Sequence, residues 1–234
     1  MRVGIIQSNY LPWRGYFDFI DDVDLFVVHD DLQFTKGDWR NRNKIRTANG
    51  PRWITVPVHY TRTAQLICET RIDYSRHWQR DHRNAIEDSL GKAPYLDDVF
   101  GLLQPAWNAE HDTISDLNVA LMTSICQYLQ IRTPLRMSAE FDLRASRTER
   151  LIELLTAVGA TTYLSGPTAR AYLDERQFAE AGIRLEYKEY VYPPYRQVQE
   201  PFEGAVSIVD TIANCGRATR MVLKSLTTAG RAAA

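Results

Sequence analysis

The chain has 234 residues, of which 44% are hydrophobic and 24% charged, and its formal net charge is -1. This composition is typical of a soluble globular protein. The near-neutral charge gives no global reason to expect DNA, RNA or an anionic membrane as a partner.

Membrane insertion and export are not expected either. No apolar run approaches the roughly 20 residues of a membrane-spanning helix, and Met1 and Arg2 lead directly into "VGII" without the segments of a signal peptide. Cys68, Cys126 and Cys215 are far apart and match neither a disulfide framework nor a zinc site. We therefore expect a cytoplasmic protein with reduced cysteines and no metal site.

The first 30 residues predict a βαβ unit. Short apolar runs at residues 3–7 and 24–29 have the size of buried strands. Between them, apolar residues recur at helical spacing over residues 13–20, just after Pro12, which a first helical turn tolerates. Strand, helix and strand in this order favour a parallel sheet with a right-handed crossover.

The remaining elements extend this pattern. Further strands are expected at residues 53–58, 162–164 and 183–187, and helices at residues 77–90, 111–129, 149–158, 207–215 and 218–226. Thr148 is expected to cap the helix at residues 149–158. The sequence thus predicts a single α/β domain over residues 1–234, with a mostly parallel sheet and flanking helices. A helical insertion or lid is expected over about residues 75–145, and the tail "AGRAAA" is expected to fray.

The first candidate site stretch is "QSNYLPWRGYF", at residues 7–17. Ligands of open α/β sheets bind beyond the carboxyl ends of the strands. Gln7, Asn9 and Tyr10 are therefore candidates for substrate binding, beside a helix N-terminus suited to an anion. In the alternative interpretation Ser8 and Asn9 only cap the helix and the aromatic residues are core. A single glycine makes no phosphate-binding loop.

The second candidate is the stretch "HDDLQFTKGDWRNRNKIR", at residues 29–46. His29, Asp30 and Asp31 follow the second strand, should emerge beside Gln7, and are the candidate catalytic residues. Adjacent carboxylates could bind Mg²⁺ or ribose hydroxyls, or act as a general base. The alternative is a loop in which the Asp side chains cap the backbone.

Cations are concentrated just after these residues. Residues 36–52 carry six Lys or Arg against the single acid Asp38. Arginine forks suit carboxylate or phosphate groups, whereas the alternative is a solvated charged loop. Nucleic-acid binding is a weaker interpretation, because the cluster is short. The candidate substrate-binding residues here are Lys36, Arg40, Asn41, Arg42 and Asn43.

Two later stretches have the character of site loops. In "YLSGPTARAYLD", Ser165 and Gly166 lie at a strand end before a helix, although a plain turn explains them too. In "EYKEYVYPPYRQ", Tyr192, Tyr195 and Gln197 surround two prolines in a stiff, donor-rich loop, or else in an aromatic packing corner. No spacing typical of a covalent nucleophile stands out, so positioning and electrostatics are the expected basis of any chemistry.

These stretches together resemble the WbqC-like family. The resemblance lies in "QSNYLPWRGYFDFI", "DLFVVHDDLQFTKGDWRNRNKI", "NGPRWITVPV", "TTYLSGPTARAYL" and "YPPYRQ...FEGAVSIVDTIANCG". Ser8 departs from the proline expected in "QPNYLPW". The resemblance implies a context of bacterial surface-polysaccharide assembly, such as O-antigen, and related biosynthesis.

A similarity of arrangement links the chain to the Rossmann-like, nucleotidyltransferase-like α/β fold that includes pantothenate synthetase. There too a strand leads into a turn and helix, and a second strand is followed by a polar stretch and "QF", here Gln33 and Phe34. The paired histidines of that fold have no counterpart in residues 10–16. The use of ATP and Mg²⁺ therefore stays open.

The resemblance and the polar loop lead us to expect an enzyme that transfers an acyl or aminoacyl group to an amino-sugar or another small amine. One of His29, Asp30 and Asp31 would act as base, and Arg40 and Arg42 would hold a carboxylate or phosphate. The donor could be a small molecule, a carrier protein or an aminoacyl-tRNA. The alternatives are a sugar-nucleotide or nucleotidyl transferase and a non-catalytic subunit that binds a small molecule.

Overall fold

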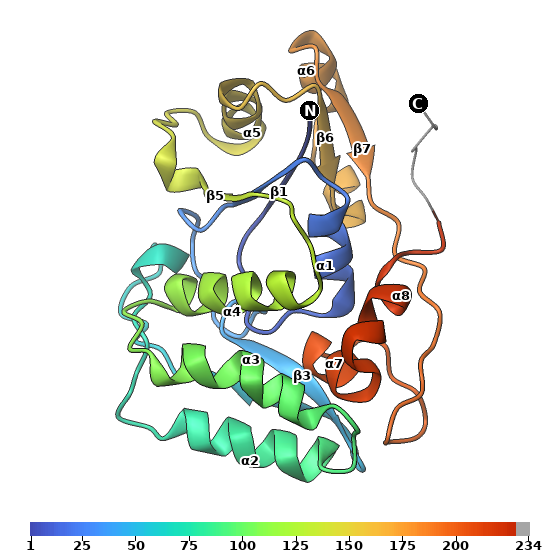
Figure 1. Cartoon of the computed structure of the whole chain (residues 1–234). Coiled ribbons are helices and arrows are strands. Elements are labelled where there is room, and N and C mark those ends of the chain that lie inside the picture. Colours follow the sequence, from blue (N-terminus) through green and yellow to red (C-terminus); the bar gives the residue numbers. More distant parts are fainter. Residues whose placement is uncertain (228–234) are drawn as a thin grey trace.

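The computed structural model describes residues 1–227, so the expected fraying of residues 229–234 lies outside the described part. Its centre is a five-stranded sheet in the order β5-β2-β1-β6-β7, in which all neighbouring strands are parallel (Figure 1). The predicted α/β class with a parallel sheet is confirmed. The strands are β1 (Arg2–Ile6), β2 (Leu25–Val28), β5 (Leu135–Met137), β6 (Thr162–Ser165) and β7 (Arg184–Tyr187).

The helices cover both faces of the sheet. They are α1 (Arg14–Asp21), α2 (Trp78–Leu90), α3 (Leu96–Asn108), α4 (Ile114–Tyr128), α5 (Arg147–Ala157), α6 (Glu175–Glu180), α7 (Ile208–Cys215) and α8 (Thr219–Leu223). Alternate residues of β1 serve the two faces. Val3 packs with Leu154 of α5 and Phe178 of α6. On the other face Gly4 lets Phe19 of α1 lie on the sheet, because a Cβ there would be 3.2 Å from the Cζ atom of Phe19.

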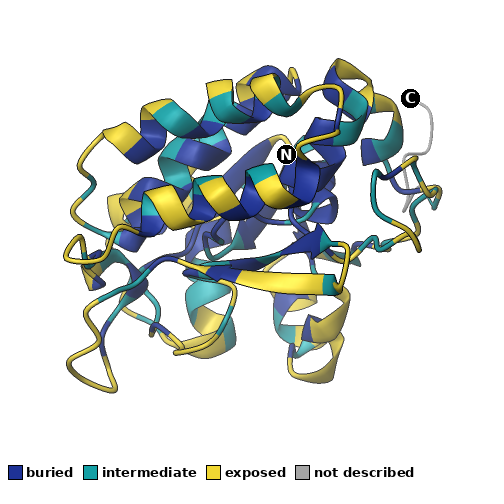
Figure 2. Ribbon diagram, turned by 90° about the horizontal axis from the view of Figure 1, so that it is seen from below, coloured by how far each residue is buried: buried dark blue, intermediate teal, exposed yellow. Residues whose placement is uncertain are grey.

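The cation-rich stretch forms a separate hairpin. β3 (Arg42–Thr47) pairs antiparallel with β4 (Gly50–Thr55), and neither strand joins the main sheet. The strand expected at residues 53–58 therefore begins earlier, at Gly50. Figure 2 shows the hairpin as one largely buried and one largely exposed strand, in line with the exposure of most of β4.

Several elements differ from the predicted ones. The helix α3, the strand β5 and the helix α6 were not expected, because α3 contains Gly101 and Pro105 and the other two are only three and six residues long. Thr148 does not cap α5, which already begins at Arg147. Ser8 and Asn9 do not cap α1 either, since Trp13 occupies that position and makes no capping bond.

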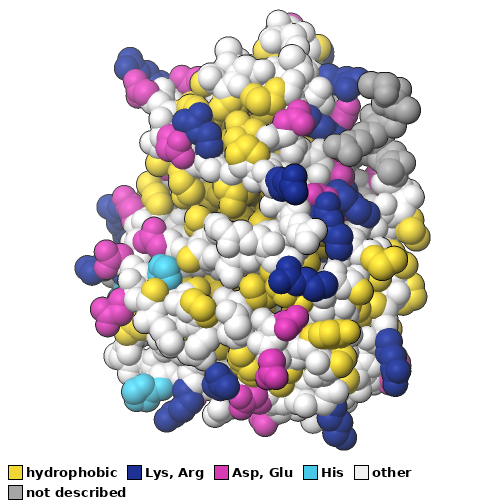
Figure 3. All heavy atoms as spheres, in the orientation of Figure 1, with side chains coloured by type: hydrophobic (Ala, Val, Ile, Leu, Met, Phe, Trp, Pro, Cys, Tyr) yellow, Lys and Arg dark blue, Asp and Glu magenta, His cyan; other side chains and the backbone are white. Residues whose placement is uncertain are grey.

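One edge of the sheet is apolar on its outer side. Figure 3 shows hydrophobic side chains gathered between α5 and α4, the place that β5 occupies in Figure 1. Leu135 and Met137 of β5 are partly buried there against the core. The middle of the sheet, at β1 and β6, positions the candidate site, because the order in which the strands are added along the chain reverses between these two strands.

Candidate functional site

A pocket of about 510 Å³ lies beside this reversal, beyond the carboxyl ends of β1 and β2 and against the start of α5. We call it the strand-end pocket. Its volume is in the range of small-molecule sites. Ile5, Ile6, Leu151 and Leu173 form apolar walls. Polar groups come from Gln7, His29, Arg147, Thr148, Arg150 and Tyr172.

His29 shares the pocket wall with an ion pair. The Nε2 atom of His29 lies 3.5 Å from Asp31 Oδ1 and 3.4 Å from Arg150 Nε. Burial lowers the pKa of His29 and the charge of Arg150 lowers it further, although Asp31 acts in the opposite direction. The imidazole is therefore neutral near pH 7 and can accept a proton.

Asp31 is held by Arg150 and by the hydroxyl of Ser138. Burial alone would raise the pKa of Asp31, but the hydrogen bond from Ser138 and the charge of Arg150 outweigh burial and keep the pKa below its usual value. Asp31 is thus an anion that fixes Arg150 beside His29. It links the end of β2 to α5.

Asp30 points to other partners. Its Oδ1 accepts the backbone N–H of Ser8 at 2.7 Å, and its Oδ2 accepts the hydroxyl of Ser115 at 2.5 Å. Only 1% of Asp30 is exposed. With both oxygens occupied, Asp30 joins the loop after β1 to the start of α4, which argues against a role as base or Mg²⁺ ligand. Within residues 1–227, no group of three or more His, Cys, Asp or Glu is placed to hold a metal ion.

Arg40 contacts two residues expected at the site, Gln7 and Asn9, and the backbone between them. Its guanidinium donates to the side-chain oxygen of Asn9, to Gln7 Oε1 at 3.3 Å and to the carbonyl of Ser8 at 3.3 Å. The loop after β1 is therefore clamped by the segment that leads into β3.

Other polar residues of these stretches serve the fold. The Nδ2 atom of Asn43 donates to the carbonyls of Tyr10 and Leu11, and this holds Leu11 at a φ of 44°. Asn41 donates to the carbonyl of Val56 at 2.8 Å. Tyr10 is fully buried, and its hydroxyl lies 2.9 Å from Nδ1 of His82. These side chains shape the loop, and among them only the buried Oδ1 of Asn41 has no partner within residues 1–227.

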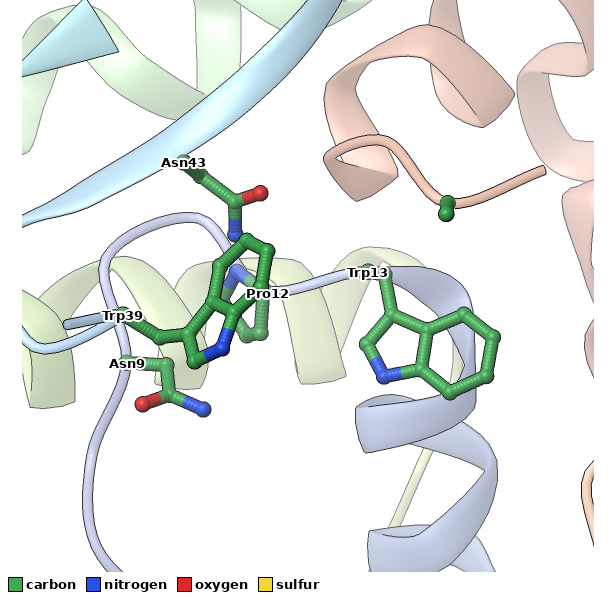
Figure 4. A pocket seen from close by; sticks show the side chains of 6 residues that line it. Asn9, Pro12, Trp13, Trp39 and Asn43 are labelled. Atoms are coloured by element: carbon green, nitrogen blue, oxygen red, sulfur yellow. The ribbon is translucent and has the colours of Figure 1, made fainter. Parts of the chain in front are cut away.

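A second hollow opens on the other side of this loop. It has a volume of about 270 Å³ and is lined by Asn9, Pro12, Trp13, Trp39, Asn43 and Ala205 (Figure 4). We call it the aromatic pocket. Trp39 is 40% exposed, and its ring centre lies 5.0 Å from that of Trp53, with the two rings tilted by 43°.

Two of the expected cations lie elsewhere. Lys36 is exposed and lines a separate hollow beside Trp78. The guanidinium of Arg42 lies 4.1 Å from the centre of the Trp53 ring and donates to the carbonyl of Gly37. Arg42 is thus engaged within the hairpin and lines neither pocket described above.

The stretch at residues 163–174 lines the strand-end pocket through Tyr163, Tyr172 and Leu173, but the two residues expected to bind there do not line it. Ser165 is buried with its Oγ 3.4 Å from the hydroxyl of Tyr163. Gly166 precedes a short 3₁₀ turn, Pro167–Ala171, in place of the helix that was expected to present an anion-binding N-terminus.

Tyr192, Tyr195 and Gln197 form a packing corner against α1 and α7. Tyr192 donates to Asp18, and both Tyr195 and Gln197 donate to Asp210, each over 2.8 Å. Burial raises the pKa of both tyrosines, so they remain neutral donors. This arrangement corresponds to the alternative expected for the stretch.

The sequence interpretation missed the contribution of α5. Arg147 and Arg150 stand in the string "SRTER", a concentration of cations at a helix start. Because the short strand before α5 escaped recognition, nothing placed this helix start at the same sheet edge as His29.

The fold and the site define an α/β protein with a pocket of about 510 Å³ at the carboxyl edge of its sheet, walled by a neutral histidine and arginines. The model of the WbqC-like protein family matches residues 7–222, and the chain belongs to this family. The predicted resemblance is thereby confirmed.

The chain is also similar to a protein of Mycobacterium tuberculosis (strain ATCC 25618 / H37Rv) that carries the description "Uncharacterized protein Rv1507c". The two are 46% identical over 218 residues, which cover 92% of this chain and 94% of that protein. No solved structure matched the chain. Among the helices of residues 1–227, none has the length and apolar character needed to cross a membrane.

Proposed function

We propose that the protein is a transferase that forms an amide, moving an acyl or aminoacyl group from a donor in the strand-end pocket onto an amine. The observation that carries the proposal is His29, a buried neutral imidazole in the wall of a pocket of small-molecule size. When the amine attacks the carbonyl carbon of the donor, the C–N bond forms and the bond from that carbon to the leaving group of the donor breaks, which for a thioester releases a thiolate. A neutral imidazole can take the proton that the amine loses and return it to the leaving group. Asp31 and Arg150 bind each other beside the imidazole of His29 and so fix the polar groups around it.

The charge of the pocket suits an anionic donor. Arg150 and the exposed Arg147 lie in the first turn of α5, where the helix dipole adds positive potential. Together they could hold a carboxylate or phosphate group and stabilise the oxyanion that forms when the amine attacks. The polysaccharide context implied by the family resemblance supplies an amino-sugar as acceptor.

A second candidate is a transferase that acts on a sugar-nucleotide. When the five strands of this sheet are numbered in the order in which they occur along the chain, their order across the sheet is 3-2-1-4-5. This order supports a Rossmann-like arrangement. Such sheets bind nucleotides at the reversal between the first and fourth strands, where the strand-end pocket lies. We also propose ATP with Mg²⁺ as a co-substrate, and a carrier protein or an aminoacyl-tRNA as alternative forms of the donor.

The test is a transfer assay by mass spectrometry. Glucosamine is incubated with acetyl-CoA, with glycine and ATP-Mg²⁺, or with a UDP-sugar, and amide or glycosyl products are sought. We expect amide product, and His29→Gln should lower kcat by about 10²- to 10⁴-fold. Arg147→Ala should mainly raise KM for the donor, and the distant Lys36→Ala should resemble wild type.

Wild-type turnover by a folded His29→Gln protein would overturn the role of His29. Glycosyl product from the UDP-sugar would support the second candidate. Binding of acetyl-CoA that Arg147→Ala abolishes, without turnover of any donor, would identify a binding subunit instead.

A further inference from the structure

The aromatic pocket is separate from the strand-end pocket and has its own chemistry. Two indole rings, of Trp13 and Trp39, and the ring of Pro12 give it flat apolar walls (Figure 4). Its volume of about 270 Å³ leaves room for one six-membered ring and its substituents. Flat aromatic walls favour a ligand ring that presents an apolar face.

The wall formed by Trp13 is fixed before any ligand arrives. Tyr190 and Tyr192 pack edge-on against its indole, with ring centres 5.2 Å and 5.5 Å away. On its other side the indole lies over Gly15 of α1, where a Cβ would be 2.6 Å from the ring atom Cε2. A wall held in this way loses little conformational entropy on binding.

One polar group is available beside the indoles. The side-chain oxygen of Asn9 is taken by Arg40. The amide nitrogen has no acceptor among residues 1–227, and Figure 4 shows it on the side of the amide that faces Trp13. A ring with hydroxyl groups at its edge could accept this hydrogen bond while its face stacks on an indole.

The two pockets are joined through Arg40. Gln7 lines the strand-end pocket, Asn9 lines the aromatic pocket, and the guanidinium of Arg40 binds both side chains. Two steps of chain span at most about 7 Å. The two pockets therefore open on opposite sides of the same short stretch of loop, and Arg40 binds a lining residue of each.

We infer that the aromatic pocket is the acceptor subsite and binds a pyranose ring. Its role as the acceptor subsite rests on the proposed function. A nucleobase shares the flat face and the polar edge, but the proposed reaction favours the pyranose because an amino-sugar carries its amine on such a ring. Arg40 then positions the two subsites relative to each other.

Saturation-transfer NMR tests the inference without turnover. The probes are the methyl glycoside of glucosamine, uridine and adenosine, each with wild type, Trp39→Ala, Asn9→Ala and Tyr60→Ala. Tyr60 is a matched control, since it is an exposed aromatic residue that lines neither pocket. We expect the glycoside to bind wild type and Tyr60→Ala alike and to bind Trp39→Ala about tenfold more weakly. Asn9→Ala should weaken binding less.

Glycoside binding that Trp39→Ala leaves unchanged, or no glycoside binding by wild type, would overturn the inference. Binding of a nucleoside in place of the glycoside would overturn the pyranose assignment. Failure of the proposed reaction is distinguishable, because glycoside binding at Trp39 can persist without transfer. Conversely, transfer that depends on His29 with glycoside binding indifferent to Trp39 would refute only this inference.

Discussion

Gly15 shows how one residue can shape a pocket from inside a helix. An exposed Gly→Ala change within a helix usually stabilises a protein by about 0.5–1 kcal/mol. At Gly15 the new methyl group would instead collide with the indole of Trp13. We expect Gly15→Ala to lower the free energy of unfolding by about 1–3 kcal/mol, as overpacked sites do. Urea unfolding monitored by circular dichroism measures it.

Gly101 provides the matched control. It lies exposed in α3, and a Cβ there meets nothing within 4 Å. Gly101→Ala should therefore raise the free energy of unfolding by up to about 1 kcal/mol. If both variants are stabilised to the same extent, the indole of Trp13 does not lie over Gly15.

For single residues, the sequence shows which polar side chains are present but not which groups they bind. Asn9 and Asn43 stand in similar polar stretches, yet Asn43 gives its amide to two backbone carbonyls whereas Asn9 keeps its amide nitrogen for the aromatic pocket. Which partner each amide finds depends on which segments, far away in the sequence, the fold places beside it. Tyr10 is the same case, because its partner His82 is 72 residues away.

Between elements, Asp30 joins β2, the loop after β1 and α4. Asp30→Asn replaces one acceptor oxygen by an NH2 donor, so the hydroxyl of Ser115 must turn from donor to acceptor, and both hydrogen bonds lose the charge of the carboxylate. We expect the free energy of unfolding to fall by about 1–3 kcal/mol. Thermal and urea unfolding measure the change.

Asp142→Asn is the control for this prediction. Asp142 is exposed and pairs with Arg144 at the surface, where ion pairs contribute about 0–1 kcal/mol. If the two variants lose equal stability, Asp30 does not hold these elements together.

Elements with a clear hydrophobic period were predictable and the others were not. The helix expected at residues 111–129 is α4, capped by Thr113 with Asp116, and Ser207 caps α7. In contrast, β3 has polar side chains on both faces, and buried Asn43 and Arg46 bond to loops that the local sequence does not reveal. Contacts with residues far away in the sequence therefore determine that this segment forms a hairpin.

For the whole molecule, the parallel sheet followed from the first βαβ unit, but the strand order did not. The order fixes which strand ends are neighbours, and therefore places His29 beside α5. The expectation of a helical lid over about residues 75–145 stays a prediction.

His82 gives the whole molecule a pH-dependent stability, because it joins α2 to β4 and to the loop after β1. The carbonyl of Thr55 can only accept, so Nε2 of His82 carries the proton and donates to it over 3.1 Å, and Nδ1 accepts from Tyr10. Burial lowers the pKa of His82 to about 4. The unfolded chain, with a histidine pKa near 6.5, binds this proton first as the pH falls. Stability contributed by His82 is therefore complete above about pH 6.5 and is lost between about pH 6.5 and 4.

The size of this loss follows from the shift in pKa and is about 3 kcal/mol. The free energy of unfolding in urea should be measured between pH 7 and 4 for wild type, His82→Gln and the exposed control His77→Gln. The variant His82→Gln lacks the titrating group. Its stability deficit relative to wild type should therefore shrink by about 3 kcal/mol as the pH falls, whereas the His77→Gln curve should stay parallel to wild type. A deficit of His82→Gln that stays constant over this range would show that the buried imidazole does not link folding to protonation, and that the bridge from Tyr10 to Thr55 tolerates the charged ring.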